Sequence, residues 1–242
     1  MLPMLPRSLL CCLLPALAIA QAGSTSPKRG LVYIGNNRHA AGDADIWHTN
    51  TALNWYYNYA RQPTPELRDT RLEFVPMYWG EPEETFLEDI KARKQAGENI
   101  THVLGFNEPD MERDVGGSDM SPEDAAELWQ EQIEPLKELG IKVGAPVVSG
   151  SPIGYAWLKE WEEACDGNCN PDFMPIHWYG IFDAFAQWVA NMSVTYPDLE
   201  LWVTEFGLPG ASLEETQVFF NQSLQMLDET RYALVGCRVC VF

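Results

Sequence analysis

Eight short apolar runs recur along this chain and leave few folds open to it. They begin between residues 31 and 232, so the seven intervals between them average about 29 residues. Continuous apolar runs of this length are typical of strands buried on both faces, as in parallel sheets. The runs are LVYIG at 31, LNWYYN at 53, LEFVPMYW at 72, HVLGF at 102, KVGAPVV at 142, FMPIHWY at 173, LELWVTEF at 199 and YALVG at 232.

Segments with helix signals separate several of these runs. One has Ser121 as a predicted N-cap, Pro122 at the first helical position and Gly140 at its end, with a kink expected at Pro135. Another, at 212–229, begins with a capping box. Alternating strands and helices require a parallel sheet, and eight strands favour a (β/α)8 TIM barrel. The last run lies close to the chain end, so we expect a short eighth unit whose completeness stays open.

The N-terminal residues predict a secretory signal peptide over 1–20. A basic residue, an apolar run and a small-x-small cleavage signal occur in the required order, whereas the alternative, a membrane anchor, needs about 20 apolar residues. Residues 21–29 form a short pro-like segment that ends in a dibasic pair, which leaves 30–242 as a single barrel domain. Secretion makes three sequons candidate glycosylation sites, at Asn99, Asn191 and Asn221.

The charge balance narrows the possible partners. The chain has 16 Lys and Arg residues against 35 Asp and Glu residues, for a formal net charge of −19. Nucleic acids and anionic membranes both need a basic surface, so we expect neither as a partner. A neutral polymer is compatible with this charge.

Four cysteines remain after the predicted signal peptide. Cys165 and Cys169 flank a glycine-containing turn and predict a disulfide in an oxidising compartment. A zinc site shared with Cys237 and Cys240 is the alternative, which secretion and the long gap between the two pairs disfavour. The pairing of Cys237 and Cys240 stays open.

Two glutamates occupy matching positions at the ends of apolar runs. Glu108 lies in GFNEPD after the fourth run, and Glu205 lies in WVTEFG at the end of the seventh. In a (β/α)8 barrel the C-terminal strand ends surround one cleft, so both carboxylates can converge there. Cleavage of a glycosidic bond needs such a pair, because one acid protonates the leaving oxygen while one carboxylate attacks carbon or activates water. We expect no metal or other cofactor.

Polar and aromatic residues at other strand ends fit a carbohydrate. Asn107 has donors and acceptors for a sugar hydroxyl, and His177 could hold the nucleophile, with a purely structural histidine as the alternative. Asp110 either lines the cleft or caps a turn. We expect five residues to bind the substrate, namely Asn107, Asn58, Trp79, His177 and Tyr179.

The ordered set of motifs resembles glycoside hydrolase family 128. GFNEPD and WVTEFG, with FVPMYWG, GAPVVSG and HWYG between them, are similar to the fungal alkali-sensitive-linkage-type wall proteins and endo-β-1,3-glucanases of that family, from about Gly30 to Tyr232. The resemblance implies that Glu108 is the acid/base and Glu205 the nucleophile of a retaining, double-displacement mechanism without a metal. It also implies β-1,3-glucan as the substrate. That family continues past the eighth strand, whereas this sequence ends in RYALVGCRVCVF.

Taken with the resemblance, the residues predict a secreted or cell-wall glycoside hydrolase, an endo-β-1,3-glucanase that acts as a monomer. Two alternatives stay open. One is a non-catalytic glucan-binding wall protein with a truncated barrel, and the other is a hydrolase of another β-linked polymer such as mannan or chitin. Replacing Glu205 by Gln separates an enzyme from a binder, because only the enzyme would lose turnover.

Overall fold

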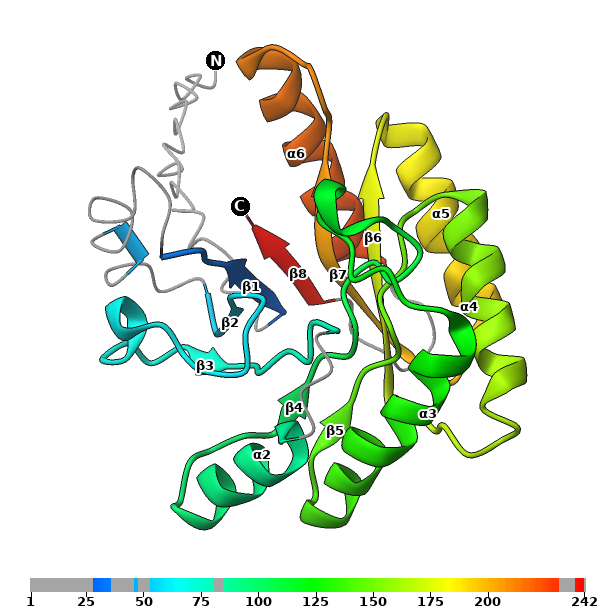
Figure 1. Cartoon of the computed structure of the whole chain (residues 1–242). Helices are drawn as coiled ribbons and strands as arrows, with labels where there is room; N and C mark the ends of the chain where they lie inside the picture. Colours follow the sequence, from blue (N-terminus) through cyan, green and yellow to red (C-terminus); the bar gives the residue numbers. More distant parts are fainter. Residues whose placement is uncertain (1–27, 36–45, 48–52, 81–84, 231–237, 242) are drawn as a thin grey trace, which may run out of the picture.

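The computed structural model describes residues 28–35, 46–47, 53–80, 85–230 and 238–241. Strands alternate with helices along these residues, which confirms the expected α/β class (Figure 1). The strands are β1 (Arg29–Val32), β2 (Trp55–Tyr57), β3 (Glu73–Phe74), β4 (His102–Val103), β5 (Lys142–Val143), β6 (Phe173–Tyr179), β7 (Glu200–Gly207) and β8 (Arg238–Val241). The α-helices are α2 (Phe86–Gln95), α3 (Pro122–Gln132), α4 (Pro152–Ala164), α5 (Phe182–Thr195) and α6 (Leu213–Glu229), with 3-10 helices at Pro65–Leu67, Arg113–Val115 and Glu134–Leu139.

All strand pairings are parallel, as predicted. Six strands pair in the order β3-β2-β1-β8-β7-β6, and β4 pairs with β5. Single parallel bridges connect this pair to its neighbours, Met77 with Leu104 after β3 and Gly144 with Phe173 at the start of β6. Because the strands are parallel, their C-terminal ends lie on the same side of the sheets.

Aromatic side chains from several strands pack together on the inner side of the sheets. The rings of Phe173 and Trp202 stack with centroids 4.3 Å apart, and Trp55 lies 4.9 Å from Trp202. All three are at most 1% exposed. A larger apolar cluster lies on the opposite side, where the helices cover the strands. Large buried rings contribute most to such cores, since each removes about 150–250 Å² from water.

The helix signals predict the observed helix ends. Ser121 accepts a hydrogen bond from the backbone N–H of Asp124 at 3.1 Å and caps α3, which begins at Pro122. After α3 ends, the chain continues as a 3-10 helix that contains Pro135, because proline lacks the N–H of a regular helix. Gly140 closes it with φ of 72°. The capping box predicted for α6 is also present.

The chain ends differ in detail from the predictions. The run at 232–236 that predicts the eighth strand lies outside the described residues, and β8 is observed at Arg238–Val241, between β1 and β7. The predicted signal peptide at 1–20 also lies outside them. Arg29 of β1 pairs with Val239 of β8, and its side chain forms an ion pair with Asp228 at 2.6 Å. The domain boundary predicted at residue 29 therefore falls within a paired strand. None of the described helices has the length and apolarity needed to cross a membrane.

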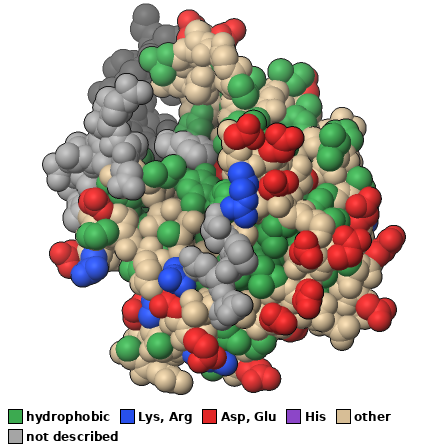
Figure 2. All heavy atoms as spheres, viewed as in Figure 1, with side chains coloured by type: hydrophobic (Ala, Val, Ile, Leu, Met, Phe, Trp, Pro, Cys, Tyr) green, Lys and Arg blue, Asp and Glu red, His purple; other side chains and the backbone are tan. Residues whose placement is uncertain are grey.

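Covalent and surface features were also predicted. Cys165 and Cys169 form the expected disulfide just after α4. Of the other pair, Cys237 lies outside the described residues. The sequon asparagines Asn99, Asn191 and Asn221 are exposed. Acidic side chains are spread over the part of the surface that carries α3, α4 and α5, in agreement with the net charge (Figure 2).

Candidate active site

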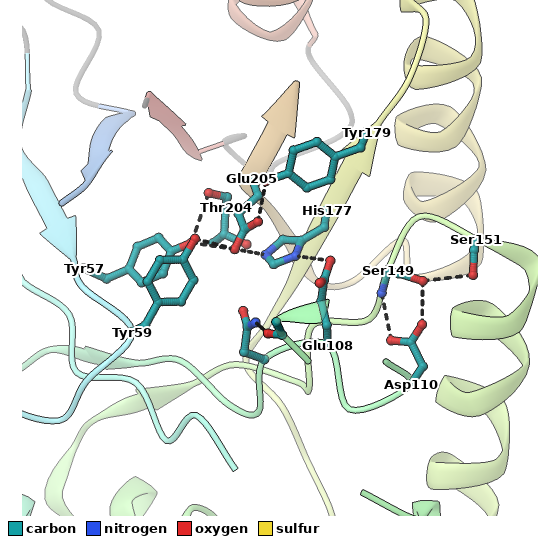
Figure 3. A network of polar contacts seen from close by, with 12 residues as sticks. Tyr57, Tyr59, Glu108, Asp110, Ser149, Ser151, His177, Tyr179, Thr204 and Glu205 are labelled. Carbon is teal, nitrogen blue, oxygen red and sulfur yellow. Dashed lines mark hydrogen bonds and ion pairs between the residues drawn. The ribbon is translucent and has the colours of Figure 1, made fainter. Parts of the chain in front are cut away.

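The two predicted acids come together at the C-terminal ends of their strands (Figure 3). Glu205 lies within β7 and is 6% exposed, whereas Glu108 follows β4. One oxygen of each carboxylate and one ring nitrogen of His177 all lie within 4.8 Å of one another. Residues separated by almost 100 positions therefore form one cluster.

A β-bulge in β7 turns Glu205 toward this cluster. The register between β6 and β7 passes from Ile176–Val203 directly to His177–Glu205, so Thr204 is an extra residue in β7. A bulge of this kind reverses the alternation of side chains along a strand. Val203 and Phe206 consequently both face the helices, although they are three residues apart. If β7 alternated regularly through Thr204, with no bulge, Glu205 would face the helices instead of the cluster.

Three tyrosines surround the Glu205 carboxylate. The hydroxyls of Tyr59 and Tyr179 donate to its two oxygens, each at 2.7 Å. The Tyr57 hydroxyl lies farther away, 3.4 Å from Oε1 and 3.3 Å from the backbone oxygen of Thr204. Burial, and next the nearby Glu205 charge, raise the pKa of Tyr59 and of Tyr179 well above the ordinary value. Both hydroxyls therefore stay protonated and remain hydrogen-bond donors to the Glu205 carboxylate.

The imidazole of His177 lies between the two carboxylates. Its Nδ1 is 3.0 Å from Oε1 of Glu108, and its Nε2 is 3.4 Å from Oε1 of Glu205. The ring is fully buried. Because each nitrogen faces a different carboxylate, this arrangement suits proton sharing better than ligation of one ion, and the absence of a metal stays a prediction.

Glu108 is held in a less regular setting. Its φ is +40°, a backbone conformation that residues other than glycine rarely adopt. Its N–H donates to the oxygen of Val147 at 2.7 Å, and the side chain is 14% exposed against 7% for Glu205. Strained backbone of this kind is concentrated at functional sites because only a strongly constrained structure maintains it.

Asn107 lies beside Glu108 and is 3% exposed. Its Nδ2 donates to the oxygen of Gly116 at 3.1 Å, whereas its buried Oδ1 has no hydrogen-bond partner among the described residues. A buried acceptor without a partner is costly, so it is a natural position for a ligand hydroxyl.

A cavity of about 700 Å³ opens above the cluster. Both acids line it, as do three of the predicted substrate-binding residues, Asn107, Trp79 and Tyr179. The Arg113 guanidinium lies 5.6 Å from the Trp79 ring. The other lining residues are Ile34, Tyr59, Met111, Val115, Gly116, Ser149, Gly150 and Ser151. Apolar walls with a few converging polar groups are typical of a small-molecule or sugar site.

Asn58 is a predicted binding residue that does not line this cavity. Its Nδ2 donates to the oxygen of Gln62 at 2.9 Å, and its Oδ1 accepts from the N–H of Ala60 at 3.2 Å, so its amide stabilises the turn after β2. The next residue, Tyr59, reaches the site instead, with φ of +59°. The aromatic run NWYYNY was the sequence signal for binding residues in this segment. The alternation of side chains along a strand could not identify Tyr59 as the residue that reaches the site.

Comparisons with known proteins point to one group. A protein-family model described as glycosyl hydrolase catalytic core matches residues 30–236. The chain is also 30% identical over 216 residues to alkali-sensitive linkage protein 1 of Schizosaccharomyces pombe. That alignment covers 85% of this chain and 37% of the relative, so the chain spans little more than a third of the relative's length.

Solved structures are similar over most of the chain. A curdlan-specific exo-β-1,3-glucanase of GH128 subgroup III from Blastomyces gilchristii, in complex with glucose, superimposes with a TM-score of 0.72 and 31% identity, covering 90% of this chain and 91% of that one. A GH128 subgroup II endo-β-1,3-glucanase from Sorangium cellulosum has a TM-score of 0.67 and 28% identity, covering 88% and 86%.

Proposed function

This chain belongs to the glycosyl hydrolase catalytic core family, within glycoside hydrolase family 128, and we propose that it is a secreted, retaining hydrolase of cell-wall β-1,3-glucan. The observation that carries the proposal is the pair of carboxylates, Glu108 and Glu205, that approach within 4.8 Å at the floor of one cavity. We further propose that the eight strands close a barrel, since the bridges beside β3 and β6 connect the two sheets.

The spacing of the two acids favours retention of configuration. Retaining glycosidases hold their carboxyl groups about 5–5.5 Å apart, whereas inverting enzymes need about 6.5–9.5 Å to admit a water between carboxylate and sugar. The nearest oxygens of Glu108 and Glu205 lie within 4.8 Å, which supports the retaining arrangement.

Two displacements follow from this geometry. Protonated Glu108 gives its proton to the glycosidic oxygen while a Glu205 oxygen attacks C1, which breaks the C–O bond and forms a glycosyl ester. Glu108, now ionised, then takes a proton from water as that water attacks C1 and releases Glu205. Each residue ends in its starting state, so the cycle consumes one water for each bond cut.

His177 supports the required proton arrangement. If Nδ1 carries the ring hydrogen and donates to Oε1 of Glu108, the other oxygen of Glu108 is left to carry the proton for the glycosidic oxygen. The same tautomer still donates to Glu108 when that residue is ionised and acts as the base, so no proton has to move within the ring between the two displacements. The ring thus gives Glu108 the same hydrogen bond at both stages.

The surroundings support a neutral glucan as the substrate. Trp79 and Tyr179 give the cavity aromatic walls, which suit the C–H faces of sugars, and the acidic surface tolerates an uncharged polymer. The two related structures are described as β-1,3-glucanases, one acting in exo and one in endo fashion. Secretion and cell-wall location rest on the N-terminal run and on likeness to alkali-sensitive linkage protein 1.

The test is sugar release from soluble and gelled β-1,3-glucan by the chain as it is secreted, beside its Glu205→Gln variant. We expect release by the parent and none by the variant, while Glu214→Gln, an exposed change on α6, leaves release intact. Chromatography of early products distinguishes glucose from mixed oligosaccharides and so exo from endo action. Retained glucan affinity without release by folded parent would contradict hydrolysis and favour a binding protein.

A further inference from the structure

Asp110 lies two residues beyond Glu108, outside the cavity wall, and makes polar contacts that the catalytic steps do not use. Its Oδ1 accepts from the backbone N–H of Ser149 at 2.9 Å, and its Oδ2 accepts from the Ser149 hydroxyl at 2.5 Å (Figure 3). Both carboxylate oxygens are therefore directed at one residue of the loop that follows β5. Charge-assisted bonds of this kind are stronger than neutral ones.

These contacts extend the pairing between β4 and β5 beyond the ends of the strands. Asn107 bridges Val147, and the N–H of Glu108 donates to the oxygen of Val147 at 2.7 Å. Two residues farther along both segments, Asp110 meets Ser149. The side chain of Asp110 thus connects the two segments beyond the point where main-chain pairing stops. Glu108 lies between the Asn107–Val147 bridge and the Asp110–Ser149 contact.

The chain of contacts continues to α4. The hydroxyls of Ser149 and Ser151 are 2.9 Å apart, and Ser151 accepts from the N–H of Gly154 at 3.0 Å as the cap of α4. A Cβ added at Gly154 would lie 2.9 Å from Oδ2 of Asp110, so the first turn of α4 packs directly on the carboxylate. The positive end of the helix dipole favours this negative charge.

We propose that Asp110 is a positioning residue for the acid/base, an inference that rests on the proposed function. Glu108 adopts a strained conformation with φ of +40°, and its carboxylate must stay within reach of both His177 and the leaving oxygen. By fastening the segment after Glu108 to Ser149 and α4, Asp110 resists the relaxation of that strain. Misplacement of a reacting group by about 1 Å can cost about 100-fold in rate.

The test compares two substrates in the full chain. Asp110→Ala is measured on a laminari-oligosaccharide, whose leaving oxygen needs a proton, and on 2,4-dinitrophenyl β-laminaribioside, whose leaving group departs unaided. Asp110→Asn is the conservative variant, and Asp114→Ala, an exposed change on the same loop, is the control. The readout is kcat/KM, which covers steps through formation of the glycosyl ester, together with the thermal unfolding midpoint.

We expect Asp110→Ala to lower kcat/KM about 30- to 100-fold on the oligosaccharide and less than about threefold on the dinitrophenyl substrate. The kcat/KM of Asp110→Asn on the oligosaccharide should lie between those of the parent and Asp110→Ala, because the Asn amide oxygen can still accept from the Ser149 N–H. If the Ala variant does not fold, Asp110→Asn and Ser149→Ala carry the test.

Equal losses on both substrates would overturn the inference, since they would indicate general damage. The inference would also be overturned if folded Asp110→Ala were as active as the control Asp114→Ala. A parent inactive on both substrates overturns the proposed function and, with it, this role for Asp110. An active parent with an unaffected Asp110→Ala variant overturns only the role of Asp110.

Discussion

The two glutamates of the site lie in contrasting surroundings. Glu205 sits within an eight-residue strand, and two tyrosine hydroxyls fix its oxygens at 2.7 Å. Glu108 follows a two-residue strand and adopts a left-handed backbone conformation, and its side chain has His177 as its hydrogen-bond partner among the described residues. The carboxylate of Glu205 is immobilised by donors, whereas that of Glu108 is supported mainly through its backbone.

This difference matches two chemical duties. A nucleophile must be ionised and held on line with C1, and protonated tyrosines supply both conditions. A group that serves first as acid and then as base must gain and lose a proton within each cycle. Several fixed donors around such a group would favour its ionised form throughout the cycle. A single hydrogen-bond partner that can either donate or accept suits the group better.

The largest expected effect comes from removing each acid in turn. Glu205→Ala and Glu108→Ala should each lower kcat/KM on glucan by at least about 10³-fold, and azide should restore turnover on the dinitrophenyl substrate. Azide replaces the nucleophile in Glu205→Ala and gives the α-glycosyl azide. In Glu108→Ala it attacks the glycosyl ester and gives the β-glycosyl azide. Nuclear magnetic resonance of the products checks this, and the reverse outcome would exchange the two roles.

A smaller effect is expected from the tyrosines. Tyr59→Phe and Tyr179→Phe each remove one 2.7 Å bond to Glu205 and should lower kcat/KM about 10- to 100-fold, because a hydrogen bond to a charged group contributes about 1.5–3 kcal/mol. Tyr57→Phe is the matched control. Its hydroxyl is 3.4 Å from the carboxylate, so its loss should cost less than about threefold. Equal effects of all three changes would contradict the contrast drawn here.

The smallest effect concerns stability in alkali. Burial raises the pKa of Tyr59 and Tyr179 in the folded chain, and raises that of Tyr56 to about 12, from an ordinary value of 10.0. Above pH 10 the unfolded chain loses these protons while the folded chain keeps them, so the free energy of unfolding should fall as pH rises. Melting temperatures from pH 8 to 11 check this. The melting temperature of Tyr59→Phe should decline less steeply with pH than that of the parent. Parallel declines of the two proteins would contradict this explanation.

The sequence predicted the acids because both stand where a buried strand stops. An acid at the end of an apolar run has few structural reasons to be there, and Glu108 and Glu205 share that setting. Parallel pairing then brings the strand ends to one side. His177 was placed at the site for the same reason, although its bond to Glu108 was not foreseen.

Other parts depended on local backbone geometry that no periodic pattern contains. Tyr59 reaches Glu205 through a positive φ, and Asn58, its neighbour in sequence, remains in the turn. The run YALVG lies outside the described residues, and β8 at Arg238–Val241 begins with a charged residue, so a search for apolar runs did not select it. Asp110 could be read either as a cap or as a cleft residue until its contact with Ser149 was known.

The bulge at Thr204 bears on how this strand can change in length. Substitutions at Thr204 alter a side chain, but the essential contribution of this residue is its backbone. The extra backbone residue shifts by one position the alternation of side chains in the rest of β7. If Thr204 were accommodated without a bulge, regular alternation would turn Glu205 to the helices and Phe206 to the sugar, whereas deleting Thr204 would restore regular alternation and leave Glu205 facing the cluster. Surface loops elsewhere absorb insertions and deletions readily. In β7, by contrast, the direction of the Glu205 carboxylate depends on how one extra backbone residue is accommodated.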